Sequence, residues 1–169
     1  LLTNIGTAAR AVRDLLRGRM SSARARIVEV EWLWLAPLLI GILAAIAIPQ
    51  YQAYTGRAQA AEAINLFSGV KTSLGEYFNE NSAWPAAGDC TAADDCNAVL
   101  GLSAAADIEG TYVGSVKAAS ATGIVTVTFD AGVHSGDTMT FTPTNNTGTI
   151  EWSCASTSIA DSQLPSSCR

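Results

Sequence analysis

Residues 41–78 read GILAAIAIPQYQAYTGRAQAAEAINLFSGVKTSLGEYF, and this stretch decides the fold. Its first part, up to Ile48, has no charged or polar side chain. In its second part, apolar residues recur at a helical spacing, at positions 64, 67, 70, 74, 77 and 78. Such a spacing places them along one stripe of a helix. The stretch therefore predicts one long helix, apolar all round in its first half and packed through one face in its second. Residues 79–85 (NENSAWP) are expected to end it.

The apolar part begins upstream of this stretch. Trp32–Ile48 is a run of seventeen residues without a charge, which as a helix spans about 25 Å, slightly short of a bilayer. One small domain cannot surround a helix that is apolar on all sides. A cleaved signal peptide is the alternative, but the run contains Pro37 and Gly41 and continues without a small-residue cleavage site into a second helical pattern. The sequence therefore predicts a retained membrane or filament-core segment.

The predicted helix is about fifty residues long, from Trp32 to the end of the amphipathic half. Pro49 lies within it, where a proline removes one hydrogen bond and kinks a helix without necessarily ending it. The residues that we assign to the membrane or filament-core segment are Trp32, Leu38, Gly41, Ile42, Leu43, Ile46, Ile48 and Pro49.

The second half of the chain alternates between apolar and polar residues with period two. The alternation is clear in residues 123–130 (GIVTVTFD), 138–143 (TMTFTP) and 149–154 (TIEWSC), and weaker in 111–117 (TYVGSVK). Turn-rich stretches separate these segments. Threonines on the outer face indicate an antiparallel sheet with one wet face. The predicted fold is α+β: a long helix packed on a four-stranded antiparallel meander, with a short helical stretch near residues 97–102.

The four cysteines fall into two close pairs, Cys90 with Cys96 and Cys154 with Cys168. As disulfides they close loops of about 7 and 15 residues. Their spacings fit no common structural zinc site. Because each pair is close in sequence, we predict the pairing Cys90–Cys96 and Cys154–Cys168, as in a small extracytoplasmic protein.

Charge is distributed unevenly along the chain. Residues 1–27 carry six arginines against Asp14, a charge of +5, whereas residues 28–169 carry four bases against fourteen acids, a charge of −10. A basic segment before an apolar run is the positive-inside pattern of a membrane-inserted helix. The acidic remainder argues against direct binding of nucleic acid.

Residues that could carry chemistry are few. The first cysteine loop is rich in oxygen ligands (Asp89, Asp94, Asp95, Asn97) but lacks EF-hand spacing, so we expect solvated acids rather than a calcium site. His134 is the single histidine and lies in a Gly/Ser turn, where we expect an exposed residue without a catalytic role. The aromatic residues of the helix (Tyr51, Tyr54, Phe67, Tyr77, Phe78) are expected to pack. With no nucleophile motif, phosphate loop or metal set, the sequence predicts neither an enzyme nor a cofactor.

Residues 41–63, GILAAIAIPQYQAYTGRAQAAEA, resemble the N-terminal helix of type IV pilins. The later parts are similar in order: an αβ loop, a four-stranded sheet, and a C-terminal disulfide loop in WSCASTSIADSQLPSSCR (152–169). The resemblance implies a homo-oligomeric helical filament on the bacterial surface, with a subunit held in the inner membrane before the pilus assembly machinery adds it. It also implies adhesion, twitching motility or DNA uptake, with surface receptors left open.

Upstream of Leu38 the sequence departs from the pilin pattern of a basic leader ending in Gly, followed by Phe-Thr-Leu-Ile-Glu. Counting back from Gly41, the position of the leader glycine is Ile27 and the position of the glutamate is Trp32. Glu31, one place early, is the nearest candidate for the assembly glutamate, so cleavage and N-methylation are not assigned. A frameshift or truncation, an engineered replacement and a divergent member are the open explanations, and we favour the first.

Together these features predict three regions. Residues 1–31 form an atypical basic head, of which residues 1–27 are expected to lie outside the mature subunit; 32–52 form the apolar helix half, and 53–169 form the globular domain. Two alternatives remain. Within the same architecture, the alternative is a type II secretion pseudopilin, against which the Cys154–Cys168 loop argues. From a different functional class, the alternative is a minor pilin or adhesin that acts as a binding module.

Overall fold

A computed structural model describes residues 2–92, 95–146 and 148–169; among residues 2–34 it describes the backbone and, of the side chains, only that of Arg13. The chain divides into two compact units, one up to Pro49 and one from Gln50 to Arg169. Helix α1 is Leu2–Asn81 and includes Pro37 and Pro49. The prediction that the helix begins at Trp32 was therefore wrong. The head is rich in Ala, Arg and Leu, which have high helix propensity, and it holds no proline before Pro37.

The C-terminal end of α1 is where the sequence placed it. The Ser82 N–H donates to the carbonyl of Phe78 at 2.8 Å, and Ser82 has a φ of 53°. The side chain of Asn81 donates to the Tyr77 carbonyl at 2.9 Å. These contacts satisfy carbonyl groups that the last turn of a helix otherwise leaves without partners. The predicted stop within residues 79–85 is confirmed.

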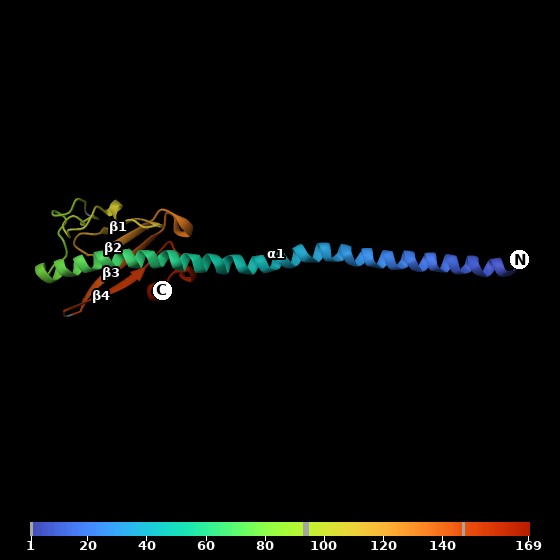
Figure 1. The fold of residues 1–169 in the computed structure, drawn as a ribbon. Helices are drawn as coiled ribbons and strands as arrows, with labels where there is room; N and C mark the ends of the chain where they lie inside the picture. Colours follow the sequence, from blue (N-terminus) through green and yellow to red (C-terminus); the bar gives the residue numbers. More distant parts are fainter. Residues whose placement is uncertain (1, 93–94, 147) are drawn as a thin grey trace. The chain divides into compact units, whose positions relative to one another are not determined.

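The sheet has four antiparallel strands in the order β1-β2-β3-β4, coloured yellow to red in Figure 1. The strands are β1 Val113–Ala118, β2 Val125–Phe129, β3 Thr138–Asn146 and β4 Thr149–Ala155. The predicted meander is confirmed, with β3 three residues longer than its alternation indicated. Four short 3-10 helices accompany them: η1 Ala105–Asp107, η2 Gly132–His134, η3 Asp161–Gln163 and η4 Ser166–Cys168.

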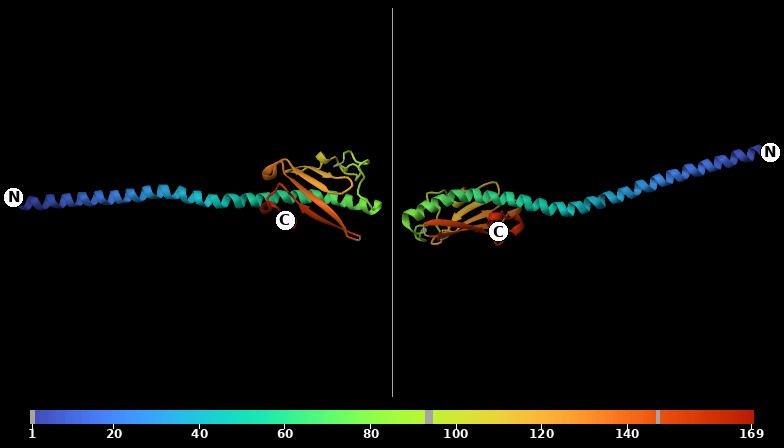
Figure 2. Two further views of the ribbon diagram at one scale, coloured as in Figure 1. Left: turned by 180° about the vertical axis from the view of Figure 1, so that it is seen from behind. Right: turned by 90° about the horizontal axis from the view of Figure 1, so that it is seen from below.

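The sheet packs one face against the part of α1 within the second unit, and Figures 1 and 2 show these as two layers. The side chains of β2 alternate between buried and partly exposed, as the sequence predicted, and Val125, Val127 and Phe129 are the buried ones. Opposite them, α1 contributes Phe67, Val70 and Leu74 to the same core. The apolar stripe of the helix and the inner faces of the strands thus form one hydrophobic core, which confirms the α+β architecture.

The segment between α1 and β1 is tied to both. On α1, the carboxylate of Glu62 accepts from the backbone N–H of Thr111 and, at 3.2 Å, from that of Tyr112. Residues 97–101 form a turn, not the short helix expected there. The turn ends at Gly101, whose φ of 68° is left-handed and stops a helix from continuing. The side chain of Asn97 joins the turn to the edge of β1: it donates to the Val116 carbonyl at 2.8 Å and accepts from the Ala118 N–H at 3.1 Å.

Candidate functional site

The apolar segment of α1 is the largest exposed apolar feature among the described side chains. Its large residues from Leu35 to Ile48 are between 48% and 66% exposed. They include Leu38, Ile42, Leu43, Ile46 and Ile48 from the predicted set. By length and composition, α1 contains a stretch that could cross a membrane. Because burial of apolar surface is favourable at about 25 cal/mol per Å², this segment requires lipid or other protein around it.

The remaining predicted residues of this segment divide into two groups. Gly41 and Pro49 lie within α1, and a Cβ built on Gly41 would meet nothing within 4 Å. The side chains of Trp32 and of Glu31, the candidate assembly glutamate, lie outside the described part of the structure. Their assignment stays a prediction.

Two disulfides join Cys90 to Cys96 and Cys154 to Cys168, and no free cysteine is present. The first lies beside the edge of β1, where the Cys96 N–H donates to the Ala118 carbonyl at 2.8 Å. The second joins β4 to η4 near the C-terminus. The second disulfide therefore fastens the C-terminal end to the edge strand β4, whereas the first closes a loop that a backbone hydrogen bond joins to the edge strand β1.

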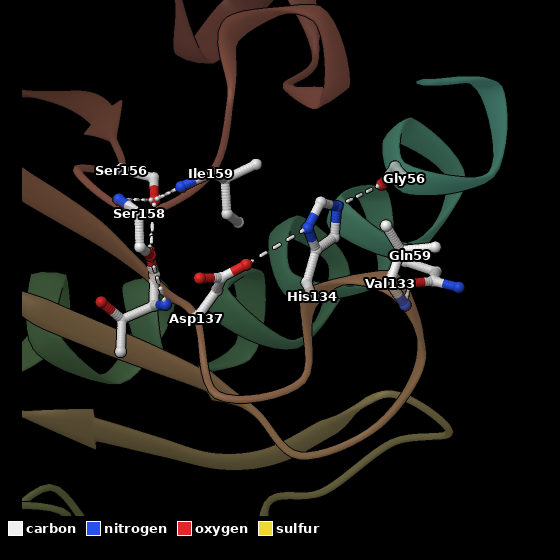
Figure 3. Close-up of polar contacts among 9 residues, drawn as sticks. Gly56, Gln59, Val133, His134, Asp137, Ser156, Ser158 and Ile159 are labelled. Atoms are coloured by element: carbon white, nitrogen blue, oxygen red, sulfur yellow. Dashed lines mark hydrogen bonds and ion pairs between the residues drawn. The ribbon is translucent and has the colours of Figure 1, made fainter. Parts of the chain in front are cut away.

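The C-terminal loop, defined as residues 156–168, is fixed by contacts of residues within it as well as by the disulfide at its end. Ile159, Leu164 and Cys168 are buried in the core. The Ser156 hydroxyl donates to the Thr138 carbonyl at 2.6 Å. It also accepts from the Ile159 N–H at 3.1 Å, a contact that is drawn in Figure 3. Buried anchors and backbone hydrogen bonds make this loop a fixed surface of the globular unit.

His134 is not the exposed turn residue that the sequence predicted. It lies in η2 between β2 and β3 and is 1% exposed. Figure 3 shows its ring pointing toward α1, with Nε2 3.0 Å from the carbonyl oxygen of Gly56. The turn folds back onto the helix because Gly56 has no side chain, and the ring also packs near Phe129 at 5.4 Å between centroids. The opposite ring nitrogen, Nδ1, has no hydrogen-bond partner and faces Asp137 at 3.6 Å.

Two further hydrogen bonds hold the same stretch of α1. The side-chain oxygen of Gln59 accepts from the Val133 N–H at 2.8 Å, as Figure 3 shows. Arg57 donates from Nη1 to the Ser162 carbonyl in the C-terminal loop at 2.6 Å. The helix at residues 56–59 is thus bonded to two segments that lie far away in the sequence.

The aromatic residues of α1 differ in environment. Phe67 is buried, and Phe78 packs on Trp84 with ring centroids 4.4 Å apart. Tyr51 and Tyr54, however, are 70% and 67% exposed, so the expectation that they pack is not met within the chain. They precede Ala60, the first buried apolar residue among the described side chains of α1.

Sequence reasoning missed the contacts of Gly56, Gln59 and Glu62, which fix the helix to the rest of the unit, and of Asn97, which bonds to the edge of β1. A glycine inside a helical pattern can mark a close approach, so Gly56 carried a signal. The other three belong to residue types that are usually exposed, and their partners are 19 to 74 positions away. In the part of the chain that is described, no cluster of three or more metal-ligating side chains was found; Asp94 of the first cysteine loop lies outside it.

Comparison with known proteins places this architecture in one family. The family model for pilins, described as bacterial filament proteins, matches residues 56–169. The chain is 41% identical over 138 residues to fimbrial protein EcpC of Eikenella corrodens, which covers 78% of this chain and 82% of that protein. It is 33% identical over 154 residues to type IV major pilin protein PilE1 of Neisseria gonorrhoeae, covering 78% and 79%.

A fimbrial protein of Neisseria meningitidis serogroup A is 35% identical over 120 residues, covering 69% of this chain and 64% of its own length. With a family model across most of the chain and relatives of this similarity, the chain belongs to the pilin family.

Proposed function

We propose that this protein is the structural subunit of a type IV pilus, a filament built from many copies of the chain. The observation that carries the proposal is the apolar segment of α1, whose large side chains from Leu35 to Ile48 stay about half or more exposed. A helix that is apolar on every side needs apolar surroundings on every side. Bundled helices of other copies provide them in a filament. The relatives named type IV major pilin support the same assembly.

The same segment suits a membrane before assembly. Its length and composition allow it to cross a bilayer, and the arginines that precede it favour the cytoplasmic side. We propose that the inner membrane holds the subunit until the assembly machinery transfers it into a surface filament. In both environments the apolar side chains stay out of water, so the transfer exchanges lipid contacts for protein contacts.

We further propose three functional regions: a basic head at 1–31, of which residues 1–27 are absent from the mature filament, an apolar helix half at 32–52, and a globular domain at 53–169. The head carries six arginines before Ile27. In a bundled core of helices each would be a charge without a partner, which is costly in apolar packing. The globular domain forms the outer surface of the filament, and this surface makes the contacts that serve adhesion, twitching motility or DNA uptake.

The experiment that tests the proposal uses a host with a pilus machine whose own major pilin gene is deleted. Residues 41–169 are expressed behind the leader and helix start of a type IV pilin. We expect filaments in the sheared surface fraction, seen by electron microscopy and containing peptides of this chain. The matched control is Leu43→Lys, which places a charge within the apolar segment and should abolish the filaments. A grafted chain that accumulates in the membrane but is never found in a filament contradicts the proposal.

A further inference from the structure

The stretch of α1 from Gln50 to Gln59 is attached to the globular unit differently from the stretch that follows it. Tyr51 and Tyr54 are mostly exposed, and from Leu35 onward, where the side chains of α1 are described, the first buried apolar one is that of Ala60. From Ala60 onward the helix is held by the hydrophobic core. Residues 56–59 are held by hydrogen bonds instead, so this attachment and the core are physically distinct.

The attachment has two arms. One is the η2 turn, where His134 bonds to the Gly56 carbonyl and the Val133 N–H bonds to Gln59, as Figure 3 shows. The other is the C-terminal loop, where the Ser162 carbonyl accepts from Arg57. Ser162 lies inside the loop that the Cys154–Cys168 disulfide closes. Both arms therefore belong to segments that lie far from the helix in the sequence and contact it only in the folded domain.

Gly56 allows the two arms to meet the helix. A Cβ at this position would lie 3.1 Å from His134 Nε2 and 3.1 Å from the Cβ of Gln163. Both distances are shorter than ordinary van der Waals contacts, so a side chain at residue 56 would push the arms away. Gly69 on the same helix has nothing within 4 Å of such a Cβ. It provides a matched site where the same substitution meets no neighbour.

We propose that these residues form a polar latch, which opens while the hydrophobic core stays folded and which positions the start of the domain helix for packing in the filament. The latch consists of Gly56, Arg57, Gln59, Val133, His134 and Ser162. Removal of its contacts frees residues 50–59 without exposing the core, because no apolar side chain has to leave it. The positioning role rests on the proposed function, whereas the separate opening does not.

Hydrogen exchange of the full chain in detergent tests the separate opening. The Val133 amide reports on the latch because it donates directly to Gln59, and amides of β2 report on the core. Local opening exposes little surface and is insensitive to denaturant, whereas global unfolding is sensitive to it. We expect Val133 exchange to be unchanged by low urea, while β2 exchange accelerates. An equal urea dependence of both would show that the latch opens only when the domain unfolds, and would overturn the proposal.

Substitutions then separate the latch from general stability. Gly56→Ala and His134→Leu should accelerate Val133 exchange by about tenfold, the scale expected for loss of one or two hydrogen bonds, and Gly69→Ala should leave it unchanged. His134→Gln keeps an N–H donor and should restore most of the protection. An effect of Gly69→Ala as large as that of Gly56→Ala would contradict the assignment.

The single histidine offers a direct reading of the latch. A carbonyl oxygen only accepts, so the contact with Gly56 requires the proton on Nε2, whatever the state of Nδ1. In the chain labelled with ¹⁵N-histidine, NMR should show one ring with a proton on Nε2 that exchanges slowly, and Gly56→Ala should abolish the slow exchange. A ring protonated on Nδ1 alone would overturn the contact.

The positioning role is tested by filament yield in the grafted chain described above. Gly56→Ala should reduce the yield by about tenfold, whereas Val127→Ala, which weakens the core but leaves the latch intact, should reduce it far less. Equal losses in both variants would show that stability alone, and not the latch, sets assembly. If the unsubstituted graft forms no filaments, the proposed function fails, while the exchange and NMR results still decide whether the latch exists.

Discussion

Phe67 of α1 and Phe141 of β3 stack with their ring centroids 4.0 Å apart and their planes inclined by only 6°. Trp152 of β4 meets the same Phe67 ring edge-on at 5.0 Å. Aromatic pairs of this kind stabilise a core beyond the area that they bury. One side chain on the helix thus contacts two neighbouring strands of the sheet.

Phe67→Ala should lower the free energy of unfolding of the globular domain by about 3–5 kcal/mol, because it removes the stacked ring and leaves a cavity between the layers. Phe67→Leu should cost clearly less. Urea denaturation followed by near-UV circular dichroism measures both. A loss below about 1 kcal/mol for the alanine variant would mean that the rings contribute little to packing.

The fragment Ala53–Arg169 should fold alone as a monomer, whereas the full chain should require detergent. The fragment contains the whole hydrophobic core and leaves out the exposed apolar segment up to Ile48. Exposed apolar surface of that size drives association in water. Size-exclusion chromatography with light scattering distinguishes these outcomes, and a full chain that stays monomeric in plain buffer would contradict the account.

The two disulfides should differ in their importance. Loss of the Cys154–Cys168 bond by Cys168→Ser should cost about 3 kcal/mol and loss of the Cys90–Cys96 bond by Cys96→Ser about 2 kcal/mol, since the longer loop loses more chain entropy in the unfolded state. Cys168→Ser should also reduce filament yield more, because it releases the loop that carries Ser162. Thermal unfolding and electron microscopy measure the two effects, and the reverse order in filament yield would contradict this role of the C-terminal loop.

Asn97→Asp should destabilise the domain by about 1–3 kcal/mol, because the fully buried side chain loses its donor to the Val116 carbonyl and leaves that acceptor without a partner. Asn65→Ala, at an exposed position of α1, is the control and should change stability by no more than about 0.5 kcal/mol. Chemical denaturation of both variants provides the comparison. Equal stability of Asn97→Asp and the unsubstituted domain would show that the hydrogen bonds of Asn97 to the edge of β1 do not stabilise the domain.

The predictable parts of the fold are the helix and the strands, because their apolar residues recur at a regular spacing in the sequence. The alternation of Val125, Val127 and Phe129 placed a strand with one buried face, and the spacing of Phe67, Val70 and Leu74 placed the helix stripe against it. Burial of apolar side chains follows directly from such periodicity. The close cysteine spacings likewise predicted the two disulfides that the structure contains.

The latch and the hydrogen bonds of Asn97 to the edge of β1 could not be predicted from such periodicity. His134 in a Gly/Ser turn indicates exposure, and only the folded chain brings that turn to Gly56, 78 positions away. Asn97 likewise acts through a strand edge 19 to 21 positions along the chain. Polar contacts at such separations leave no period in the sequence, because each depends on a single pair of groups meeting in the tertiary structure.

The central claim is that copies of this chain bundle through the apolar helix half, without the basic head, to form a filament. The most direct measurement is intact-mass spectrometry of the subunit in filaments sheared from cells that make the protein, with the filaments imaged by electron microscopy. The account predicts filaments whose subunit contains the globular domain and the apolar segment but not residues 1–27. Filaments whose subunit mass still includes residues 1–27, or surface filaments that contain no copy of this chain, would contradict it.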